Sequence, residues 1–348
     1  PKVVANMEPA RWLDAGKYSH ALCLLSHSDG GGRRPAIAPL VNAASLAETQ
    51  GTGQDREARA GYHVCDLMRE LHAQVITAAV DRLFREACTR MADDVRAALE
   101  RALNQEQGEL GREVLLQLLK NAEVAAAERL PLCQDTGLAV MFVELGQDVH
   151  VVGGSLEAAL NEGVRSAYVG AMLRCSCVAE PAHARINTGD NTPAIVHMRV
   201  VPGDRLRIVA LPKGAGAENK STLTMLEPSR GIRGVIDSVV DTVQRGGASA
   251  CPPLVVGVGV GGNFEKAALL AKQALLRPLG STSLVPRLAS LESELKTRCN
   301  ALGIGPMGLG GTVTVLDVFV EEAPCHIASL PVAVNLQCHA QRHREVLL

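Results

Sequence analysis

The sequence predicts an α+β fold (mixed α/β), in which a helical N-terminal part precedes mixed sheets with packed helices. Apolar residues recur at helical spacing early in the chain, and β-branched runs of strand length follow them. Later strands and helices alternate through both hairpins and crossovers, which is typical of mixed sheets. Hydrophobic residues make up 47% of the 348 residues, enough for a substantial core, and no apolar run approaches the ~18 residues of a membrane span.

The N-terminal part is expected to be an extension followed by helices. Residues 1–62 are rich in Ala, Gly and Ser and show no sustained period, so they predict a segment of low structural content. Residues 63–345 are assigned to one main domain. Within it, apolar residues recur at helical spacing from Asp66 onward, which predicts that residues 64–130 are helical.

The middle of the chain predicts strands joined by short turns. Between residues 137 and 152, the runs LAVMFVEL and VHVV, split by GQD, predict a strand pair, and residues 156–173 return to the helical period. Residues 194–201 and 205–211, joined by PGD, predict a hairpin. Further elements are predicted beyond it: helices at about 229–245, 263–276 and 285–301, and strands at 254–260, 312–320 and 330–336.

Composition excludes several classes of partner and compartment. The net charge is −2, so the field that would mark a nucleic-acid binder is missing. Ten cysteines are too few for a secreted disulfide scaffold of this length, and the N-terminal residues lack the pattern of a signal peptide. We therefore expect a cytoplasmic protein with reduced thiols and no membrane partner.

One segment resembles a phosphate-binding loop. Residues 214–221, GAGAENKS, come close to the GxxxxGK[ST] pattern, but Asn219 stands where the second Gly must be. Only Gly readily adopts the positive φ that lets the backbone wrap a phosphate. The sequence therefore disfavours an ATPase.

A second segment resembles a dinucleotide-binding turn. Gly257, Gly259 and Gly262 satisfy GxGxxG between a strand and a helix, but no acidic residue for the ribose lies between Glu265 and Glu292. A nicotinamide oxidoreductase stays a minor alternative. We interpret the glycines as a tight strand-to-helix turn packed against another backbone.

Three cysteines stand out because each lies at the edge of a predicted strand beside residues that turn the chain. They are Cys133 in LPLCQDTG, Cys251 in ASACPPL and Cys338 in NLQCHAQRH. Their separations are too long for a zinc ribbon or a ferredoxin-type run, so spacing alone is a weak signal.

The longer motifs closely resemble the α-subunit of the iron–sulfur (class I) fumarate hydratase and L-tartrate dehydratase family. The resemblance runs in order over about residues 65–345. It is carried by INTGDNTPAIVHMRVVPGDRLRI (186–208), KGAGAENKSTLTML (213–226), ACPPLVVGVGVGG (250–262), LLRPLG (275–280), LGIGPMGLGG (302–311) and HIASLPVAVNLQCHAQRH (326–343).

The resemblance implies a cofactor and its ligands. In that family three cysteines hold a [4Fe–4S] cluster whose fourth iron has no protein ligand, and those positions fall on Cys133, Cys251 and Cys338. Thiolate suits such a cluster, and an open iron acts as a Lewis acid.

The resemblance also implies the site residues. Asp135 is expected to donate a proton to the departing hydroxyl, and His326 matches a family active-site histidine. Gln134 lines the substrate site, Arg174 binds a substrate carboxylate, and Gly216 presents its N–H to the other carboxylate. Without the resemblance, Asp135 could be a turn carboxylate, Arg174 a surface residue and His326 a core histidine.

The chain departs from the family pattern at two motifs. KGAGAEN replaces the usual KGGGSEN through Ala215 and Ala217, which could alter substrate contact, and LRCSCV brings Cys175 and Cys177 beside Arg174. A fourth cysteine ligand would close the catalytic iron, so the remaining cysteines are expected not to be ligands: Cys23, Cys65, Cys88, Cys175, Cys177, Cys299 and Cys325.

We expect a hydro-lyase α-subunit that acts on a small dicarboxylate. Single-chain relatives carry a second module after the third cysteine, whereas this sequence ends ten residues after Cys338. A separate β-subunit is therefore expected to complete the site, as (αβ)2 or a larger assembly. Fumarate and (S)-malate are the preferred substrates because of the NTGDNTPA and KGxGxEN forms. L(+)-Tartrate is the alternative, and a non-catalytic iron–sulfur redox or iron sensor is a further one.

Overall fold

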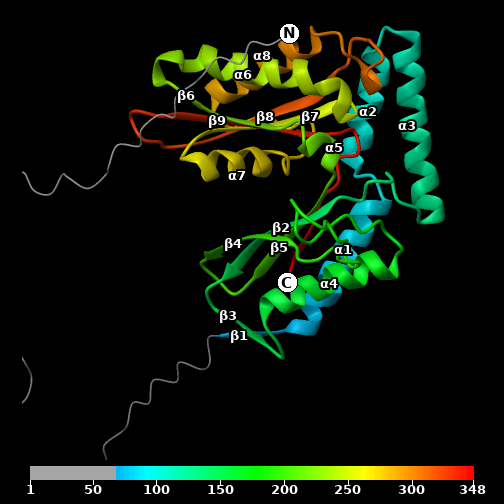
Figure 1. Ribbon diagram of the computed structural model, residues 1–348, viewed down its shortest axis with the longest axis vertical. Helices are drawn as coiled ribbons and strands as arrows, with labels where there is room; N and C mark the ends of the chain where they lie inside the picture. The colour runs from blue at the N-terminus through cyan, green and yellow to red at the C-terminus, as the bar shows by residue number, and fades with distance from the viewer. Residues whose placement is uncertain (1–67) are drawn as a thin grey trace, which may run out of the picture. The chain divides into compact units, whose positions relative to one another are not determined.

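The computed structural model describes residues 68–348 (Figure 1). The predicted extension, residues 1–62, lies outside the described residues. The helices are α1 (Ala73–Thr89), α2 (Asp93–Gln105), α3 (Glu109–Glu128), α4 (Leu156–Gly170), α5 (Ala215–Glu218), η2 (Pro228–Arg230), α6 (Gly231–Gly246), η3 (Gly247–Ala250), α7 (Phe264–Ala274), α8 (Pro286–Asn300) and η4 (Pro306–Gly308). The strands are β1 (Arg69–His72), β2 (Leu138–Gly146), β3 (Val149–Val152), β4 (Ile195–Val201), β5 (Leu206–Lys213), β6 (Thr222–Leu226), β7 (Leu254–Gly261), β8 (Val315–Ala323), β9 (Leu330–Gln337) and β10 (Arg344–Leu347). The α+β class is confirmed.

The first large sheet has the strand order β10-β5-β2-β4, and it corrects the predicted hairpin. β4 and β5 are both strands, but β2 lies between them, parallel to β4 and antiparallel to β5. β2 is buried along most of its length and therefore needs a partner at each edge. The PGD sequence connects two strands that do not pair with each other.

The predicted pairing of β2 with β3 is also wrong. β3 pairs in parallel with β1, the short strand that begins the described region. The intervening GQD segment bonds to another turn: the N–H groups of Gly146, Gln147 and Asp148 donate to carbonyl oxygens within residues 201–205. Because the segment bonds to this other turn, β3 does not fold back onto β2. β1 likewise corrects the expectation that residues 64–130 are helical throughout.

The second large sheet has the strand order β6-β9-β7-β8 and carries helices on both faces (Figure 1). β7 is parallel to β8 and antiparallel to β9, which in turn is antiparallel to β6. Buried side chains of α6 and α8 pack against β7, β8 and β9 on one face, and α7 covers the other. β6, a short and partly exposed edge strand, was not predicted.

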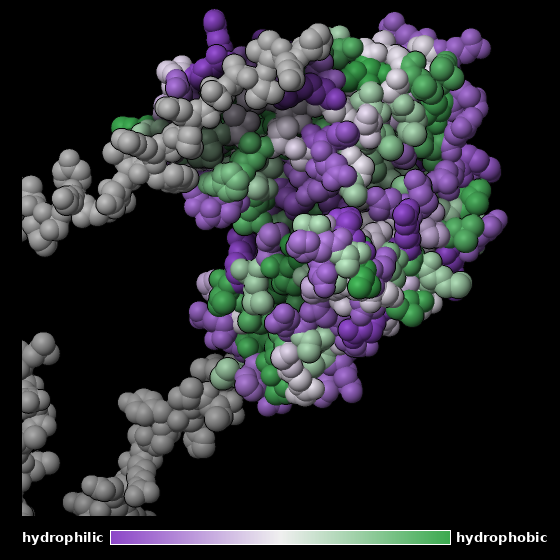
Figure 2. All heavy atoms as spheres, in the orientation of Figure 1, coloured by the Kyte–Doolittle hydropathy of each residue, from purple (hydrophilic) through white to green (hydrophobic). Residues whose placement is uncertain are grey.

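Helix α7 also faces the first sheet, so it joins the two halves of the core. Leu269 of α7 and Leu276, which follows the helix, pack against buried residues of β2 and β5, including Phe142 and Leu211. On the other face of the first sheet, α1 and α4 pack together against β2 and β5. α2 and the start of α3 pack against β7 and β8. Exposed hydrophobic residues lie over the outer side of α3, at the upper right of Figure 2.

The glycines of the GxGxxG segment let α7 approach β7, which confirms the interpretation as tight backbone packing. A Cβ at Gly257 would lie 2.1 Å from the carbonyl oxygen of Ala271, and one at Gly259 would lie 2.1 Å from that of Ala267. Both carbonyls belong to α7. These positions therefore exclude any side chain for reasons of packing alone.

Gly259→Ala is expected to lower the free energy of unfolding by about 3 kcal/mol, because the new methyl overlaps the backbone of α7. Urea unfolding of the purified chain measures this. Gly216→Ala is the control, since a Cβ there meets nothing within 4 Å. Equal stability of the two variants would contradict the packing argument.

No helix in the described part of the chain is long and apolar enough to cross a membrane.

Candidate active site

Cys251 and Cys338 lie at one edge of the second sheet. Cys251 shortly precedes β7, and Cys338 directly follows β9. β7 and β9 are antiparallel, and Val255 pairs with Gln337, so the start of one strand lies beside the end of the other. The backbone N–H of His339 donates to the carbonyl oxygen of Cys251 over 3.3 Å. Two distant segments of sequence are thus hydrogen-bonded at this edge.

Cys133, in the connection from α3 to β2, lies within electrostatic range of both. Burial raises the pKa of the Cys251 thiol, and the neighbouring Cys133 and Asp135 raise it further. Burial also raises the pKa of Cys338; the positive charge of Arg342 opposes that rise, and Cys133 adds to it. All three thiols are free and half-buried. The structure therefore brings the three cysteines into one region.

The three thiols are not arranged around a single metal ion. Among residues 68–348, no group of three or more His, Cys, Asp or Glu side chains could hold one ion. An iron–sulfur cluster has a different requirement, because each cysteine binds a different iron and the thiols stand further apart than ligands of one ion.

Asp135 connects the cysteine region to the loop that begins at Gly214. Its Oδ1 accepts the N–H of Gly137 at 3.0 Å, and its Oδ2 accepts the N–H of Ala215 at 2.8 Å. The segment that resembles a phosphate loop therefore directs the N–H of Ala215 at a carboxylate of this chain. Gly216 follows on the exposed side of α5, and a Cβ there would meet nothing within 4 Å.

The two alanines of the KGAGAEN motif have different surroundings. Ala215 is exposed and its N–H holds Asp135. Ala217 is 4% exposed and packs in the core beside α6. A change at residue 217 therefore affects the core beneath the loop, and only residue 215 faces the site.

Arg174 and Gln134 lie on the exposed side of the same region. The hydroxyl of Thr136 donates to the carbonyl oxygen of Arg174 at 2.8 Å, which ties Arg174 to the CQDTG segment. The side chains of Arg174 and Gln134 are exposed. Arg174 makes no ion pair with the described residues. Its guanidinium can therefore bind an anion from solution.

His326 is not brought to this region within the chain. It lies in the turn between β8 and β9, where its Nδ1 accepts the N–H of Ala328. Cys338 follows the other end of β9, and an eight-residue strand spans about 25 Å at ~3.3 Å per residue. Cys325 lies in the same turn as His326, with its Sγ near the carbonyl oxygen of Ser329.

The other described cysteines have surroundings of two kinds. Cys88 and Cys299 are buried, and burial raises their pKa values to about 11 and about 12. Cys175 and Cys177 are half-buried beside Arg174, where the side chain of Asn191 accepts the N–H of Cys177. Cys23 and Cys65 lie outside the described residues.

A partly buried ion network anchors the Gly214 loop, and sequence analysis missed it. Lys213 is 2% exposed; its Nζ lies 3.0 Å from Glu218 Oε2 and donates to the carbonyl oxygen of Leu336 at 2.8 Å. Lys272 of α7 binds the other oxygen of Glu218, and Asn335 donates to Oε2. The network holds the loop against the end of β9 that leads to Cys338. Lys213 and Glu218 stand in the KGAGAEN motif, but only the fold shows that they are paired.

The Glu218 carboxylate is expected to stabilise the protein at neutral pH and to lose this effect at strongly acidic pH. Burial alone would raise the pKa of Glu218, but the charges of Lys213 and Lys272 and two hydrogen bonds outweigh it and lower the pKa to about 2. Its contribution is therefore fully present above pH 4.5 and is lost as the pH falls from 4.5 toward about 2. Urea unfolding at a series of pH values measures the change. As the pH falls, the free energy of unfolding should decrease less for Glu218→Gln than for the unaltered chain. Glu227→Gln, at an exposed carboxylate, should match the unaltered chain; an equal loss in all three proteins would contradict the expectation.

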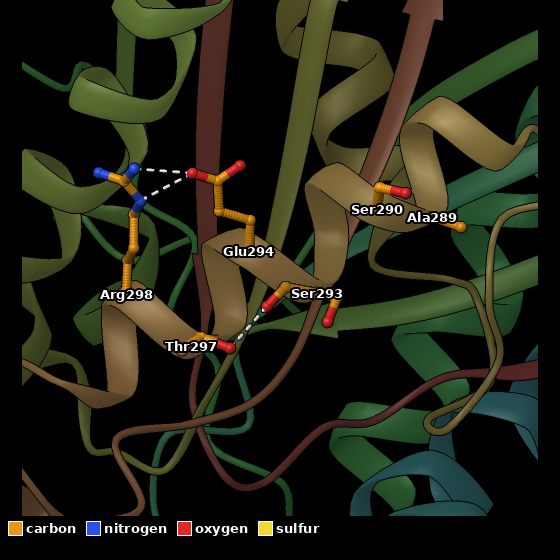
Figure 3. Close-up of a pocket in the computed structure, with 6 residues that line it drawn as sticks. All are labelled: Ala289, Ser290, Ser293, Glu294, Thr297 and Arg298. Carbon is orange, nitrogen blue, oxygen red and sulfur yellow. Dashed lines mark hydrogen bonds and ion pairs between the residues drawn. The ribbon is translucent and has the colours of Figure 1, made fainter.

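A surface depression lies over α8 (Figure 3). All six residues that line it belong to α8, and its polar groups bond within the helix. Glu294 pairs with Arg298, and the hydroxyl of Thr297 donates to the carbonyl oxygen of Ser293. We assign no site to this depression.

Known proteins resemble the chain over most of its length. Residues 77–347 match the family described as Fumarate hydratase (Fumerase). A protein of Methanocaldococcus jannaschii named "Putative L(+)-tartrate dehydratase subunit alpha" is 41% identical over 272 residues, which cover 77% of this chain and 95% of that protein. The L(+)-tartrate dehydratase subunits alpha of Escherichia coli O157:H7 and Shigella boydii serotype 4 are each 34% identical over 262 residues, covering 75% of this chain and 86% of theirs.

The family match spans β2, β7 and β9, so it includes every segment that brings a cysteine to the candidate site. It confirms the resemblance on which the predicted enzyme class depends. The chain therefore belongs to the fumarate hydratase family of hydro-lyases.

Proposed function

We propose that this chain is the α-subunit of an L(+)-tartrate dehydratase that holds a [4Fe–4S] cluster on Cys133, Cys251 and Cys338. A separate β-subunit completes the active site, in an (αβ)2 or larger assembly. The observation that carries the chemistry is the meeting of the three cysteine segments beside Asp135 and the Gly214 loop. The subunit names of the similar proteins support both the substrate and the partner.

The residues present fit such a cluster. The three thiols are free and half-buried, Cys133 acts electrostatically on both of the others, and thiolate is the usual protein ligand of cluster irons. A buried arginine, Arg342, lies near Cys338, and its positive charge suits an anionic set of thiolates. The cluster would supply a Lewis acid that assists departure of the substrate hydroxyl.

Dehydration of a 2,3-dihydroxy dicarboxylate needs both carboxylates held while a proton and a hydroxyl leave. The exposed guanidinium of Arg174 would bind one carboxylate, and the N–H of Gly216, an exposed residue, would receive the other. Gln134 would line the site between them. These contacts orient the substrate so that the hydroxyl to be lost faces Asp135.

Asp135 would transfer the proton to the departing hydroxyl. Each of its oxygens accepts one backbone N–H, which fixes the carboxyl group and leaves a further lone pair on each oxygen. Removal of the proton on carbon requires a base, which we assign to the β-subunit. Loss of water gives an enol, which tautomerises to the 2-oxo dicarboxylate oxaloacetate. His326 stays a predicted active-site residue that the fold separates from Cys338 by the length of β9.

Fumarate hydration is the second candidate. The NTGDNTPA and KGxGxEN forms favour it, and it was the preferred function on sequence grounds. The similar proteins named above favour L(+)-tartrate instead. Both reactions remove or add water beside a carboxylate, so they require the same groups from this chain.

The experiment is a comparison of substrates with the reconstituted enzyme. The chain and a β-subunit from the same source are co-expressed, loaded anaerobically with iron and sulfide, and assayed for oxaloacetate formed from L(+)-tartrate and for (S)-malate formed from fumarate. A higher kcat/KM for L(+)-tartrate is expected. A higher value for fumarate would assign the second candidate, and a loaded cluster without either activity would favour an iron–sulfur sensor.

A further inference from the structure

Buried polar atoms without partners are concentrated around Cys338. In the described part of the chain, all such side-chain atoms except Ser281 Oγ belong to residues 335–343. They are Asn335 Oδ1, Gln337 Oε1, Gln341 Oε1, Arg342 Nε and Nη1, and His343 Nδ1. Buried polar groups in native proteins are nearly always bonded, so such a concentration marks a place where a polar group belongs.

Arg342 is the charged member of this set. It lies in the connection that leads from β9 of the second sheet to β10 of the first, and it is 1% exposed. Its Nε and Nη1 have no hydrogen-bond partner, and no carboxylate oxygen of residues 68–348 lies within the 4.0 Å of an ion pair. A buried guanidinium in this state destabilises the fold.

The groups near Arg342 include two thiols, the Tyr168 hydroxyl, the His339 ring and the Asp135 region. Its charge acts on Cys338 and on Cys88, which in turn lies near Cys133. A Cβ added at Gly214 would come within 3.6 Å of Arg342 Nη2 and 3.3 Å of Asp135 Oδ2. The guanidinium therefore lies close to Cys338 and to the point at Gly214 that Asp135 also approaches.

We propose that Arg342 is a positioning residue whose guanidinium compensates the negative charge of the thiolate-bound cluster. The inference rests on the proposed function. Each bound thiolate brings a negative charge into a half-buried site, and Arg342 is the buried cation beside them that no carboxylate of the described residues neutralises. Its charge then destabilises the chain without the cluster and stabilises the chain with it. A purely structural arginine would stabilise both forms.

The test compares three variants, each as the iron-free chain and as the reconstituted chain. Arg342→Met removes the charge at similar length, and Arg342→Lys keeps it. Arg344→Met is the matched control, since Arg344 lies two residues on and its guanidinium donates to the carbonyl oxygens of Arg90 and His343. Thermal unfolding is measured for the iron-free chain, and the loss of iron to a chelator is measured for the reconstituted chain.

Arg342→Met should raise the melting temperature of the iron-free chain and should speed iron loss by roughly 10- to 100-fold. Arg342→Lys should lose iron at a rate between those of Arg342→Met and the unaltered chain. Arg344→Met should lower the melting temperature and leave iron loss unchanged. A lower melting temperature for Arg342→Met together with unchanged iron retention would overturn the inference.

The design separates this inference from the proposed function. If the unaltered chain binds iron and Arg342→Met retains it equally well, only the role of Arg342 fails. If the unaltered chain binds iron but has no hydro-lyase activity with its β-subunit, the proposed function fails and the role of Arg342 stands. If the unaltered chain takes up no iron after reconstitution, both fail.

Discussion

Replacing Cys133, Cys251 or Cys338 by serine is expected to remove the cluster and to lower kcat/KM of the reconstituted enzyme by more than about a thousandfold. A serine hydroxyl is a far weaker ligand for cluster iron than a thiolate. Loss of a metal Lewis acid removes several kcal/mol of transition-state stabilisation, and each ~1.4 kcal/mol is tenfold in rate. Iron content, visible absorbance and activity of each variant with the β-subunit measure the effect.

Cys325→Ser is the matched control for these three. Cys325 is exposed and lies in the turn before β9, whereas Cys338 follows the other end of that strand. This variant should keep its iron, its visible absorbance and its activity. Loss of the cluster from Cys325→Ser, or a full cluster in any of the other three, would contradict the ligand assignment.

Asp135→Asn is expected to lower kcat by about 10²- to 10⁴-fold while the cluster is retained. An amide cannot transfer a proton to the departing hydroxyl, and general acid catalysis is worth about that factor. Asparagine also has one acceptor oxygen where the carboxylate has two, so one of the bonds from Gly137 and Ala215 is lost. Steady-state kinetics and iron content of the αβ complex separate the loss of chemistry from the loss of the cluster.

Asp317→Asn is the control for this change. Asp317 of β8 also accepts a backbone N–H, that of Gly280, but it pairs with Lys296 on α8. Its substitution should cost some stability and leave kcat unchanged. A similar fall in kcat for both variants would show that Asp135 acts through the fold and not through the reaction.

The sequence predicted the ranges of the helices and strands better than it predicted which strands pair. The segments now seen as α4, α6, α8 and β7 have long, regular patterns, and their ranges were predicted to within a few residues. Strand pairing depends on contacts distant in sequence. β2 enters between β4 and β5, and β3 pairs with β1, although local turn sequences predicted a hairpin of β4 with β5 and a pair of β2 with β3. The short strands β1, β6 and β10 carry too few residues to show a period.

The candidate site also has residues that the sequence predicted and residues that only the fold shows. Motif resemblance singled out Cys133, Cys251 and Cys338, and the antiparallel pairing of β7 with β9 explains why the last two lie at one edge. Arg342 and the Lys213–Glu218 pair could not be found from the sequence, because a charged residue becomes informative only when its burial and its partners are known.

The most direct test of the account is the iron and sulfide content of the reconstituted chain. The account predicts about four irons and four sulfides per chain, with the broad visible absorbance of a cluster, and a loss of all three signals when Cys133, Cys251 and Cys338 are replaced together. Equal iron and sulfide in the unaltered chain and in the triple variant would contradict it.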